Sequence, residues 1–186
     1  AFRAGQEPLI EAVCSGRDAV GVMPTGGGKS MCYQVPSLLL EGVTLVISPL
    51  ISLMKDQVMA LCAAGVPAAY LNSSLTAPQQ REVCARLLDG AYRIVYVAPE
   101  RLCAGRFPET AARLRIPLLA VDEAHCISQW GQDFRPSYLR IPEFVASLPR
   151  RPVLAAYTAT ATQQVREDIE RLLELDDPLR IVTGFD

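Results

Sequence analysis

A glycine-rich segment near the amino end carries residues whose types and spacing suit phosphate binding. Residues 19–30 run from an apolar stretch into Thr25, Gly26, Gly27, Gly28, Lys29 and Ser30. Glycines let backbone N–H groups converge on phosphate oxygens without a Cβ in the way. The helix that follows adds partial positive charge. Lys29 is placed to reach the β- and γ-phosphates of ATP, and Ser30 to ligate Mg²⁺. A strict phosphate-loop pattern requires glycine at position 23, where this chain has Met23, so the match is partial.

An acidic segment further along the chain suits the metal and the water of ATP hydrolysis. The apolar run Leu118–Val121 ends in Asp122, Glu123, Ala124 and His125. Two adjacent carboxylates at the end of a buried strand are costly without a cation. We expect Asp122 to hold Mg²⁺ and Glu123 to orient and deprotonate the attacking water. A solvated turn is the common alternative for an isolated Asp-Glu pair. His125 is the only histidine; it is either structural or a link from the nucleotide site across a cleft.

The segment directly after His125 combines aromatic and basic residues. Residues 126–136 contain the only tryptophan, Trp130, with Phe134 and Arg135 four and five residues later. Burial in the core and exposure in a loop are equally compatible with the two aromatic side chains by themselves. Glycine and polar neighbours favour an exposed loop, and aromatics beside arginine are suited to stacking on bases and contacting phosphates.

These segments require a scaffold that brings the ends of several strands together. Short apolar runs predict strands at Ala19–Met23, Thr44–Ser48, Ala68–Leu71, Arg93–Val97, Leu118–Val121, Val153–Tyr157 and Leu179–Val182. Helices are predicted between them at Lys29–Leu40, Ile51–Ala64, Ala77–Leu88, Pro136–Ser147 and Thr162–Leu175. Thr76 is a candidate N-cap for the third helix. The alternation predicts an α/β fold with a mostly parallel central sheet and helices on both faces, with ligands bound at one edge.

The composition is that of a globular domain and argues against a membrane-spanning or disulfide-rich protein. The 186 residues suit one domain, and 50% hydrophobic with 20% charged residues is a globular balance. No apolar run approaches the roughly 18 residues that span a bilayer. The six cysteines contain no CxxC pair, so we expect buried or half-buried thiols of a cytosolic protein rather than a zinc site or disulfides. The net charge of −2 argues mildly against tight DNA binding by this chain alone.

A series of motifs, in order along nearly the whole chain, resembles the RecQ-type DNA helicases of superfamily 2. They are residues 2–6, 23–36, 48–57, 96–102, 122–136 and 157–161, the fifth of which is similar to the family's DEAH motif with its aromatic-rich loop. The resemblance implies a RecA-like P-loop NTPase domain over residues 1–186. Because the chain begins at Ala1 without methionine, we expect it to be a piece of a longer protein.

The resemblance implies roles residue by residue. Adenine would be recognised by Arg3 and Gln6, and the phosphates by Thr25, Gly26, Gly27, Gly28, Lys29 and Ser30. Residues near the DNA path or coupling DNA to ATP turnover would be Ser48, Pro49, Arg101, Gln129, Trp130, Phe134, Arg135, Thr158 and Thr160. Position 132 is Gln where many members have His, which puts a role for that side chain in doubt.

The resemblance also implies partners. A second RecA-like lobe of the parent chain would supply an arginine finger, worth roughly 10³–10⁵ in rate in other nucleotide hydrolases. We therefore expect these residues alone to bind nucleotide weakly, hydrolyse little and unwind nothing. The parent would be a 3′–5′ DNA helicase of the cytoplasm, on the nucleoid if bacterial, acting in DNA repair and recombination.

Other functional classes remain open at this stage. A nucleotide-binding scaffold without catalysis is disfavoured by the intact Lys29 and Glu123. A small-molecule kinase leaves the loop from Trp130 to Arg135 without a purpose. RNA helicases share much of the ATP site, and the aromatic loop favours the DNA branch.

Overall fold

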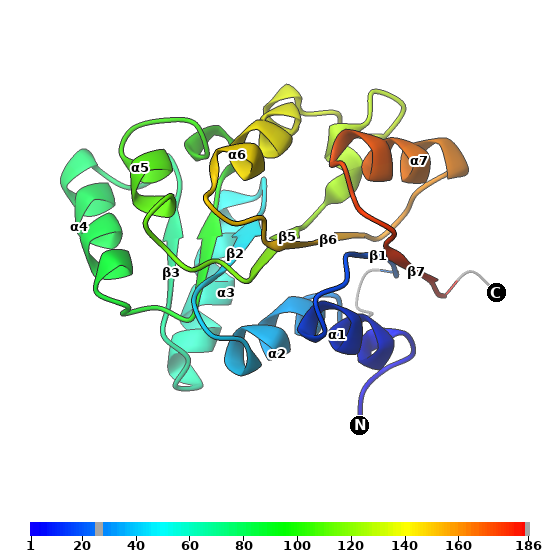
Figure 1. Ribbon diagram of the computed structural model, residues 1–186, viewed down its shortest axis with the longest axis horizontal. Coiled ribbons are helices and arrows are strands. Elements are labelled where there is room, and N and C mark those ends of the chain that lie inside the picture. Colours follow the sequence, from blue (N-terminus) through cyan, green and yellow to red (C-terminus); the bar gives the residue numbers. More distant parts are fainter. Residues whose placement is uncertain (25–27, 185–186) are drawn as a thin grey trace.

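A computed structural model describes residues 1–24 and 28–184. Within them, seven parallel strands form one sheet in the order β3-β4-β2-β5-β6-β1-β7 (Figure 1). The strands are β1 (Ala19–Val22), β2 (Thr44–Ile47), β3 (Ala68–Leu71), β4 (Ile94–Val97), β5 (Leu118–Val121), β6 (Val153–Thr158) and β7 (Leu179–Val182). The predicted α/β fold with a parallel sheet is confirmed.

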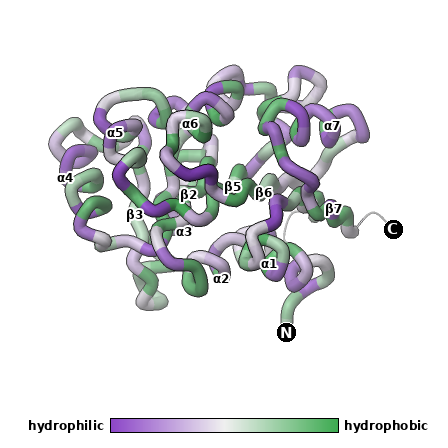
Figure 2. The backbone as a smooth tube through the Cα atoms, in the orientation of Figure 1, coloured by the Kyte–Doolittle hydropathy of each residue, from purple (hydrophilic) through white to green (hydrophobic). Residues whose placement is uncertain are grey.

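The sheet is buried on both faces, which explains its near-continuous apolar strands. Side chains alternate between two cores: Leu45 and Ile47 of β2 belong to one, and Val46 between them belongs to the other. Figure 2 shows the hydrophobic backbone segments concentrated in this central layer.

Helices cover the two faces in separate layers (Figure 1). One layer contains α1 (Gln6–Cys14), α2 (Met31–Leu39) and α3 (Ile51–Ala63), which pack into the same core. The other contains α4 (Ala77–Leu88), α5 (Phe107–Ala111), α6 (Ile141–Ser147) and α7 (Gln163–Leu172). Three short 3₁₀ helices lie at η1 (Pro99–Arg101), η2 (Ala124–Ile127) and η3 (Pro136–Arg140).

Local signals account for the ends of two helices, α4 and α7. The predicted cap at Thr76 is confirmed, because its hydroxyl accepts from the Gln79 N–H in a capping box. The helix predicted over residues 162–175 ends at Leu172, since Glu174 adopts a positive φ of 54°.

Two helix predictions were wrong in detail, and two helices were not predicted. The helix after the glycines begins at Met31 rather than Lys29, because residues 29–30 form a tight turn first. The predicted helix 136–147 is a 3₁₀ helix followed by α6, because the ring of Pro142 clashes with a continuous α-helix at the preceding turn. The α1 and α5 helices were not predicted.

The cysteine prediction was wrong at two positions. Cys62 and Cys103 are exposed. Cys62 follows the buried Leu61 on α3, and the helical period turns it toward solvent. No helix among the described residues combines the length and hydrophobicity needed to cross a membrane.

Candidate active site

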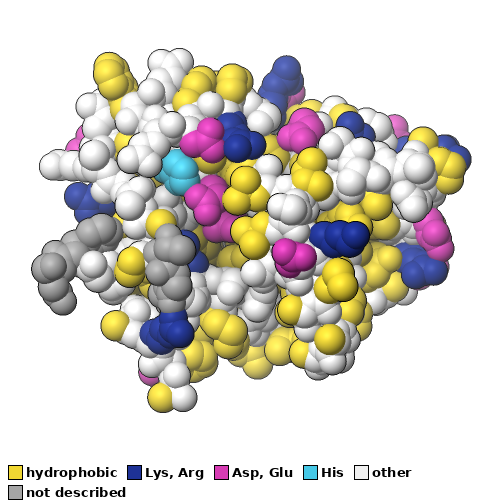
Figure 3. All heavy atoms as spheres, turned by 180° about the vertical axis from the view of Figure 1, so that it is seen from behind, with side chains coloured by type: hydrophobic (Ala, Val, Ile, Leu, Met, Phe, Trp, Pro, Cys, Tyr) yellow, Lys and Arg dark blue, Asp and Glu magenta, His cyan; other side chains and the backbone are white. Residues whose placement is uncertain are grey.

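The carboxyl ends of β1, β2 and β5 open into a cavity of about 740 Å³. Adjacent parallel strands end at the same edge of a sheet, so segments far apart in sequence meet there. The predicted site residues that line the cavity are Arg3, Gln6, Gly28, Lys29, Ser30, Ser48, Asp122 and Glu123. Figure 3 shows the single histidine beside acidic side chains on this face of the molecule.

The end of the phosphate loop is held by the amino-terminal segment. The Gln6 side chain is buried, donates to the Gly28 carbonyl at 2.9 Å and accepts from the Arg3 N–H at 2.7 Å. Gly28 has a φ of 76°, and a Cβ there would collide with the Gln6 amide. Thr25, Gly26 and Gly27 lie outside the described residues. Gln6 therefore joins the segment predicted to bind adenine to the loop predicted to bind phosphate.

Lys29 and Ser30 stand between this loop and α2. The Lys29 ammonium donates to the carbonyls of Met23 and Pro24 at 3.2 and 3.4 Å. Ser30 is the N-cap residue of α2, and its hydroxyl makes no capping hydrogen bond. An ammonium and a hydroxyl lining one cavity are a donor set suited to phosphate and its Mg²⁺.

The acidic pair is fixed by backbone geometry. Asp122 continues β5, and its N–H donates to the Ile47 carbonyl at 2.8 Å. Glu123 then adopts φ 51° and ψ 44°, a left-handed conformation that costs a non-glycine residue energy and is concentrated at functional sites. The buried Tyr138 hydroxyl donates to the Asp122 carbonyl at 2.8 Å. This reversal of the chain turns consecutive carboxylates toward the cavity.

The electrostatics of the pair favour a cation. Burial, followed by the neighbouring Glu123 carboxylate, raises the pKa of the Asp122 carboxyl to about 6, against the lowering effects of the Glu123 N–H and Lys29. A divalent cation among these oxygens would offset both unfavourable effects. The residues present therefore fit Mg²⁺ carried by a nucleotide.

His125 connects the acidic pair to the end of β6. The Thr158 hydroxyl donates to the Thr160 carbonyl at 3.1 Å. It therefore accepts from His125 Nδ1, which lies 2.7 Å away, and this assigns the proton to Nδ1. The same nitrogen lies 3.6 Å from Glu123 Oε2. A movement of Thr158 would thus shift the His125 imidazole and, with it, the surroundings of the Glu123 carboxylate.

The aromatic segment is an exposed loop, as predicted. The side chain of Trp130 is 71% exposed, whereas Phe134 is half-buried. Arg135 donates to the Pro49 carbonyl at 3.4 Å and pairs with Asp133 at 3.1 Å. The loop therefore contacts the segment after β2, which was predicted to face DNA. Gln129 and Gln132 are exposed.

Not all predicted residues converge. Arg101 lies away from the large cavity, beside one of about 150 Å³, and donates to Gln80 Oε1 at 3.0 Å. Thr160 lines a third cavity of about 280 Å³ together with His125 and Trp130.

Sequence reasoning missed several buried and half-buried polar groups that support the site. In the sequence, Tyr138 is an ordinary tyrosine within a predicted helix, and nothing there indicated that its hydroxyl supports the acidic pair. At the wall of the large cavity, which Gln57 and Tyr96 line, Gln34 Nε2 donates to Gln57 Oε1 at 2.7 Å and to the Tyr96 hydroxyl at 3.0 Å. This network joins α2, α3 and β4. Its members lie inside segments 23–36, 48–57 and 96–102, which is the only sequence signal they carried.

Comparison with known proteins places the chain in a family. The DEAD/DEAH box helicase model matches residues 3–169. The chain belongs to the DEAD/DEAH box helicase family. It is 50% identical to the ATP-dependent DNA helicase RecQ of Bacillus subtilis over 185 residues, 99% of this chain and 31% of that protein. It is 48% identical to the RecQ helicase of Pasteurella multocida, over 100% of this chain and 29% of that protein.

A solved helicase structure shares the fold. The Mycobacterium smegmatis helicase Lhr bound to ssDNA and AMP-PNP matches with a TM-score of 0.77 at 18% identity, over 99% of this chain and 26% of that one. This DEAD/DEAH domain spans less than a third of the length of the RecQ relatives named above.

Proposed function

We propose that this chain is the ATP-binding motor lobe of a RecQ-like 3′–5′ DNA helicase, in which ATP hydrolysis drives DNA unwinding. The observation that carries the proposal is the exposed loop that follows His125. It presents Trp130 to solvent, while His125 at its base lies 3.6 Å from the Glu123 carboxylate and forms a hydrogen bond with Thr158. Nearly 50% identity to two proteins named RecQ DNA helicase supports the same conclusion.

The proposed nucleotide roles follow from the cavity. Bound ATP with Mg²⁺ would supply the phosphoanhydride and the cation that neutralises its charge. Lys29 would contact the β- and γ-phosphates, with Thr25, Gly26, Gly27 and Gly28 providing backbone donors. Ser30 and Asp122 would hold the metal ion, and Glu123 would take the proton of the attacking water. Arg3 and Gln6 line the same cavity and would bind adenine.

The proposed coupling roles follow from the loop contacts. Trp130 would stack on bases, with Gln129 and Phe134 beside it. Arg135 would link that event to Ser48 and Pro49 through its bond to the Pro49 carbonyl. The effect of DNA binding would reach Glu123 through the hydrogen bonds that join His125, Thr158 and Thr160. Arg101 would contact DNA separately, since it lies outside the ATP cavity.

The proposal also includes partners and location. DNA, single-stranded or partly duplex, is the proposed substrate. A second RecA-like lobe of the parent chain would complete the ATP site, so residues 1–186 alone would bind nucleotide weakly and turn over little. A role in DNA repair or recombination, in the cytoplasm or on a bacterial nucleoid, follows from the RecQ similarity.

Two substitutions in the full-length protein test the function. Lys29→Ala removes the cation expected at the phosphates, and ATPase activity should fall to background with or without single-stranded DNA. Trp130→Ala should reduce stimulation by DNA far more than turnover without DNA. Leu39→Ala, an exposed apolar truncation on α2, is the matched control and should change neither. An unaltered protein whose ATPase is never stimulated by DNA would refute the helicase proposal and favour a scaffold or a small-molecule kinase.

A further inference from the structure

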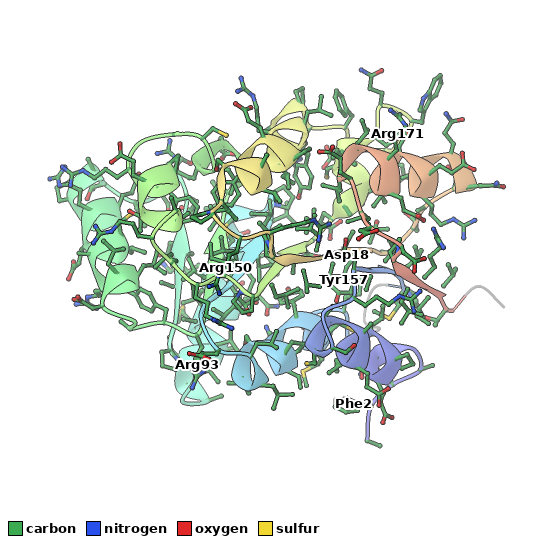
Figure 4. All side chains as sticks on the ribbon, viewed as in Figure 1. Phe2, Asp18, Arg93, Arg150, Tyr157 and Arg171 are labelled. Carbon is green, nitrogen blue, oxygen red and sulfur yellow. The ribbon has the colours of Figure 1, made fainter. Side chains whose placement is uncertain are left out.

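A buried hydrogen bond ties the aromatic loop to α7. The Ser128 hydroxyl donates to Asp168 Oδ2 at 2.7 Å, and both residues are buried. The other carboxylate oxygen, Oδ1, accepts from Arg171 at 3.0 Å. Arg171 has a side chain that is 70% exposed, and it lies on the outer side of α7 (Figure 4). A hydrogen bond to a buried carboxylate is among the stronger kinds, so this one restrains the loop.

Ser128 passes that restraint to the tryptophan backbone. Its hydroxyl oxygen accepts from the Trp130 N–H at 3.1 Å, and its carbonyl accepts from the Gly131 N–H at 3.1 Å. A Cβ on Gly131 would lie 2.7 Å from the His125 carbonyl, so the chain passes close to the histidine. The backbone of the loop is therefore fixed from beneath, while the indole remains 71% exposed.

The helix at the other end of this bond continues directly from the Thr158 segment. The α7 helix is capped by Thr162, whose hydroxyl accepts from the Val165 N–H at 3.3 Å, only two residues beyond Thr160. Asp168 lies on the second turn of that helix. A displacement at the end of β6 would therefore move α7 and Asp168 with it.

The loop is thus attached twice to one continuous segment. The first attachment is His125 to Thr158 and the second is Ser128 to Asp168. A cavity of about 280 Å³, lined by Trp130 and Thr162 among others, lies between loop and helix and gives the loop space to shift. With both attachments, Trp130 and Thr158 are mechanically linked; with only the first, Trp130 is free to move without Thr158.

We propose that Asp168 is a positioning residue. It holds the Trp130 loop in a fixed position relative to the Thr158 segment, so that a movement of the loop on DNA binding is transmitted to the proposed ATP site. It acts through Ser128 and contacts neither DNA nor nucleotide. The inference rests on the proposed function, since it requires ATP turnover that DNA stimulates.

The test compares four variants of the full-length protein by ATPase activity, with and without single-stranded DNA. Asp168→Ala and Ser128→Ala each remove the bond. Asp168→Asn keeps an oxygen that accepts from the Ser128 hydroxyl. Arg171→Ala, the matched control, removes only the exposed ion pair and keeps the bond.

The first two variants should lose on the order of tenfold in the ratio of DNA-stimulated to basal turnover, the effect expected for losing a hydrogen bond to a charged group. Basal turnover and the KM for ATP should stay within about twofold, because the bond is remote from the nucleotide. Asp168→Asn should restore most of the stimulation, and Arg171→Ala should keep it. The double variant of Ser128 and Asp168 should lose little more than Ser128→Ala alone, because the Ser128–Asp168 bond is already absent there and only the exposed Arg171 pair is removed in addition.

The outcomes distinguish failure of the proposed role of Asp168 from failure of the proposed helicase function. If the unaltered protein is not stimulated by DNA, the proposed function fails. If it is stimulated and Asp168→Ala keeps the full ratio, only the role of Asp168 is refuted. Equal losses of basal and stimulated turnover would also refute it, because they would show a purely structural effect. The Ser128–Asp168 bond would be excluded as the link between Trp130 and Thr158 by one pair of results. In that case Ser128→Ala keeps the full ratio of DNA-stimulated to basal turnover, while Asp168→Asn does not restore it.

Discussion

Asp18 offers a direct test of how burial changes the energy of an ion pair. It precedes β1, which lies between β6 and the edge strand β7 (Figure 4), and its side chain is almost completely buried. Its carboxylate accepts from Arg151 at 3.1 and 2.6 Å, from the Leu154 N–H at 3.0 Å and from the Asp176 N–H at 2.8 Å. One side chain thus holds together the starts of β1 and β6 and the turn before β7.

Asp18→Asn should destabilise the chain strongly. The amide keeps one acceptor oxygen and places an NH₂ group against donors, so about half of the hydrogen bonds are lost. A hydrogen bond to a charged group contributes roughly 1.5–3 kcal/mol. Because the Arg151 side chain is 43% exposed, its share is reduced by solvent. We expect the free energy of unfolding to fall by about 3 kcal/mol, which lowers Tm by roughly 6–12 °C in a chain of this size.

The effect should depend on pH in one direction. Burial alone would raise the pKa of the Asp18 carboxyl, but bonds from Arg151, Asp176 and Leu154 outweigh it and hold that pKa below its usual value. The stabilisation is therefore fully present above the unfolded pKa of about 4 and is lost as the pH falls through the lower folded pKa. The difference in the free energy of unfolding between Asp18→Asn and the unaltered chain should be constant from about pH 5 to 7. It should shrink below about pH 4.

Urea unfolding of the 186-residue chain, followed by circular dichroism, measures the change. Glu170→Gln is the matched control, because Glu170 and Arg180 approach equally closely at 2.6 Å but on the surface. Surface pairs contribute little, so the control should unfold close to the unaltered chain. Equal losses in the two variants, or an Asp18→Asn effect that grows below pH 4, would refute the reasoning.

Three further predictions concern the site. Tyr138→Phe removes the donor to the Asp122 carbonyl and should cost about 1–2 kcal/mol in urea unfolding; Tyr92→Phe, whose hydroxyl has no partner among the described residues, should cost nothing measurable. Gly28→Ala forces a Cβ into the Gln6 amide at a positive φ and should weaken binding of a fluorescent ATP analogue by about tenfold or more; an unchanged Kd would contradict the proposed loop geometry. Thr158→Val removes the acceptor for His125 and should lower DNA-stimulated ATPase of the full-length protein, whereas Thr158→Ser should retain it; equal activity of the two would exclude the hydroxyl relay.

Much of the scaffold, and the convergence of the candidate site residues on one cavity, could be predicted from sequence because the signals are local. Each predicted strand lies within one or two residues of its observed bounds, since an apolar run buried on both faces is encoded in four to six neighbouring residues. The glycine segment and the Asp122-Glu123 pair each follow such a run, so a parallel sheet brings them to one edge. The helix broken at Pro142 shows the limit of periodicity where a proline interrupts it.

The sequence by itself determined which groups meet at the carboxyl edge of the sheet, whereas the tertiary structure decided how they are connected. The His125–Thr158 and Ser128–Asp168 bonds join residues 33 and 40 apart. They form because β5 lies next to β6 and α7 packs over η2. Hydroxyl and carboxylate side chains carry no periodic signal of their partners, and the left-handed turn at Glu123 is imposed by the packing around it. The local pattern therefore identifies the residues of the candidate site, and only the strand order shows how the exposed Trp130 is linked to them.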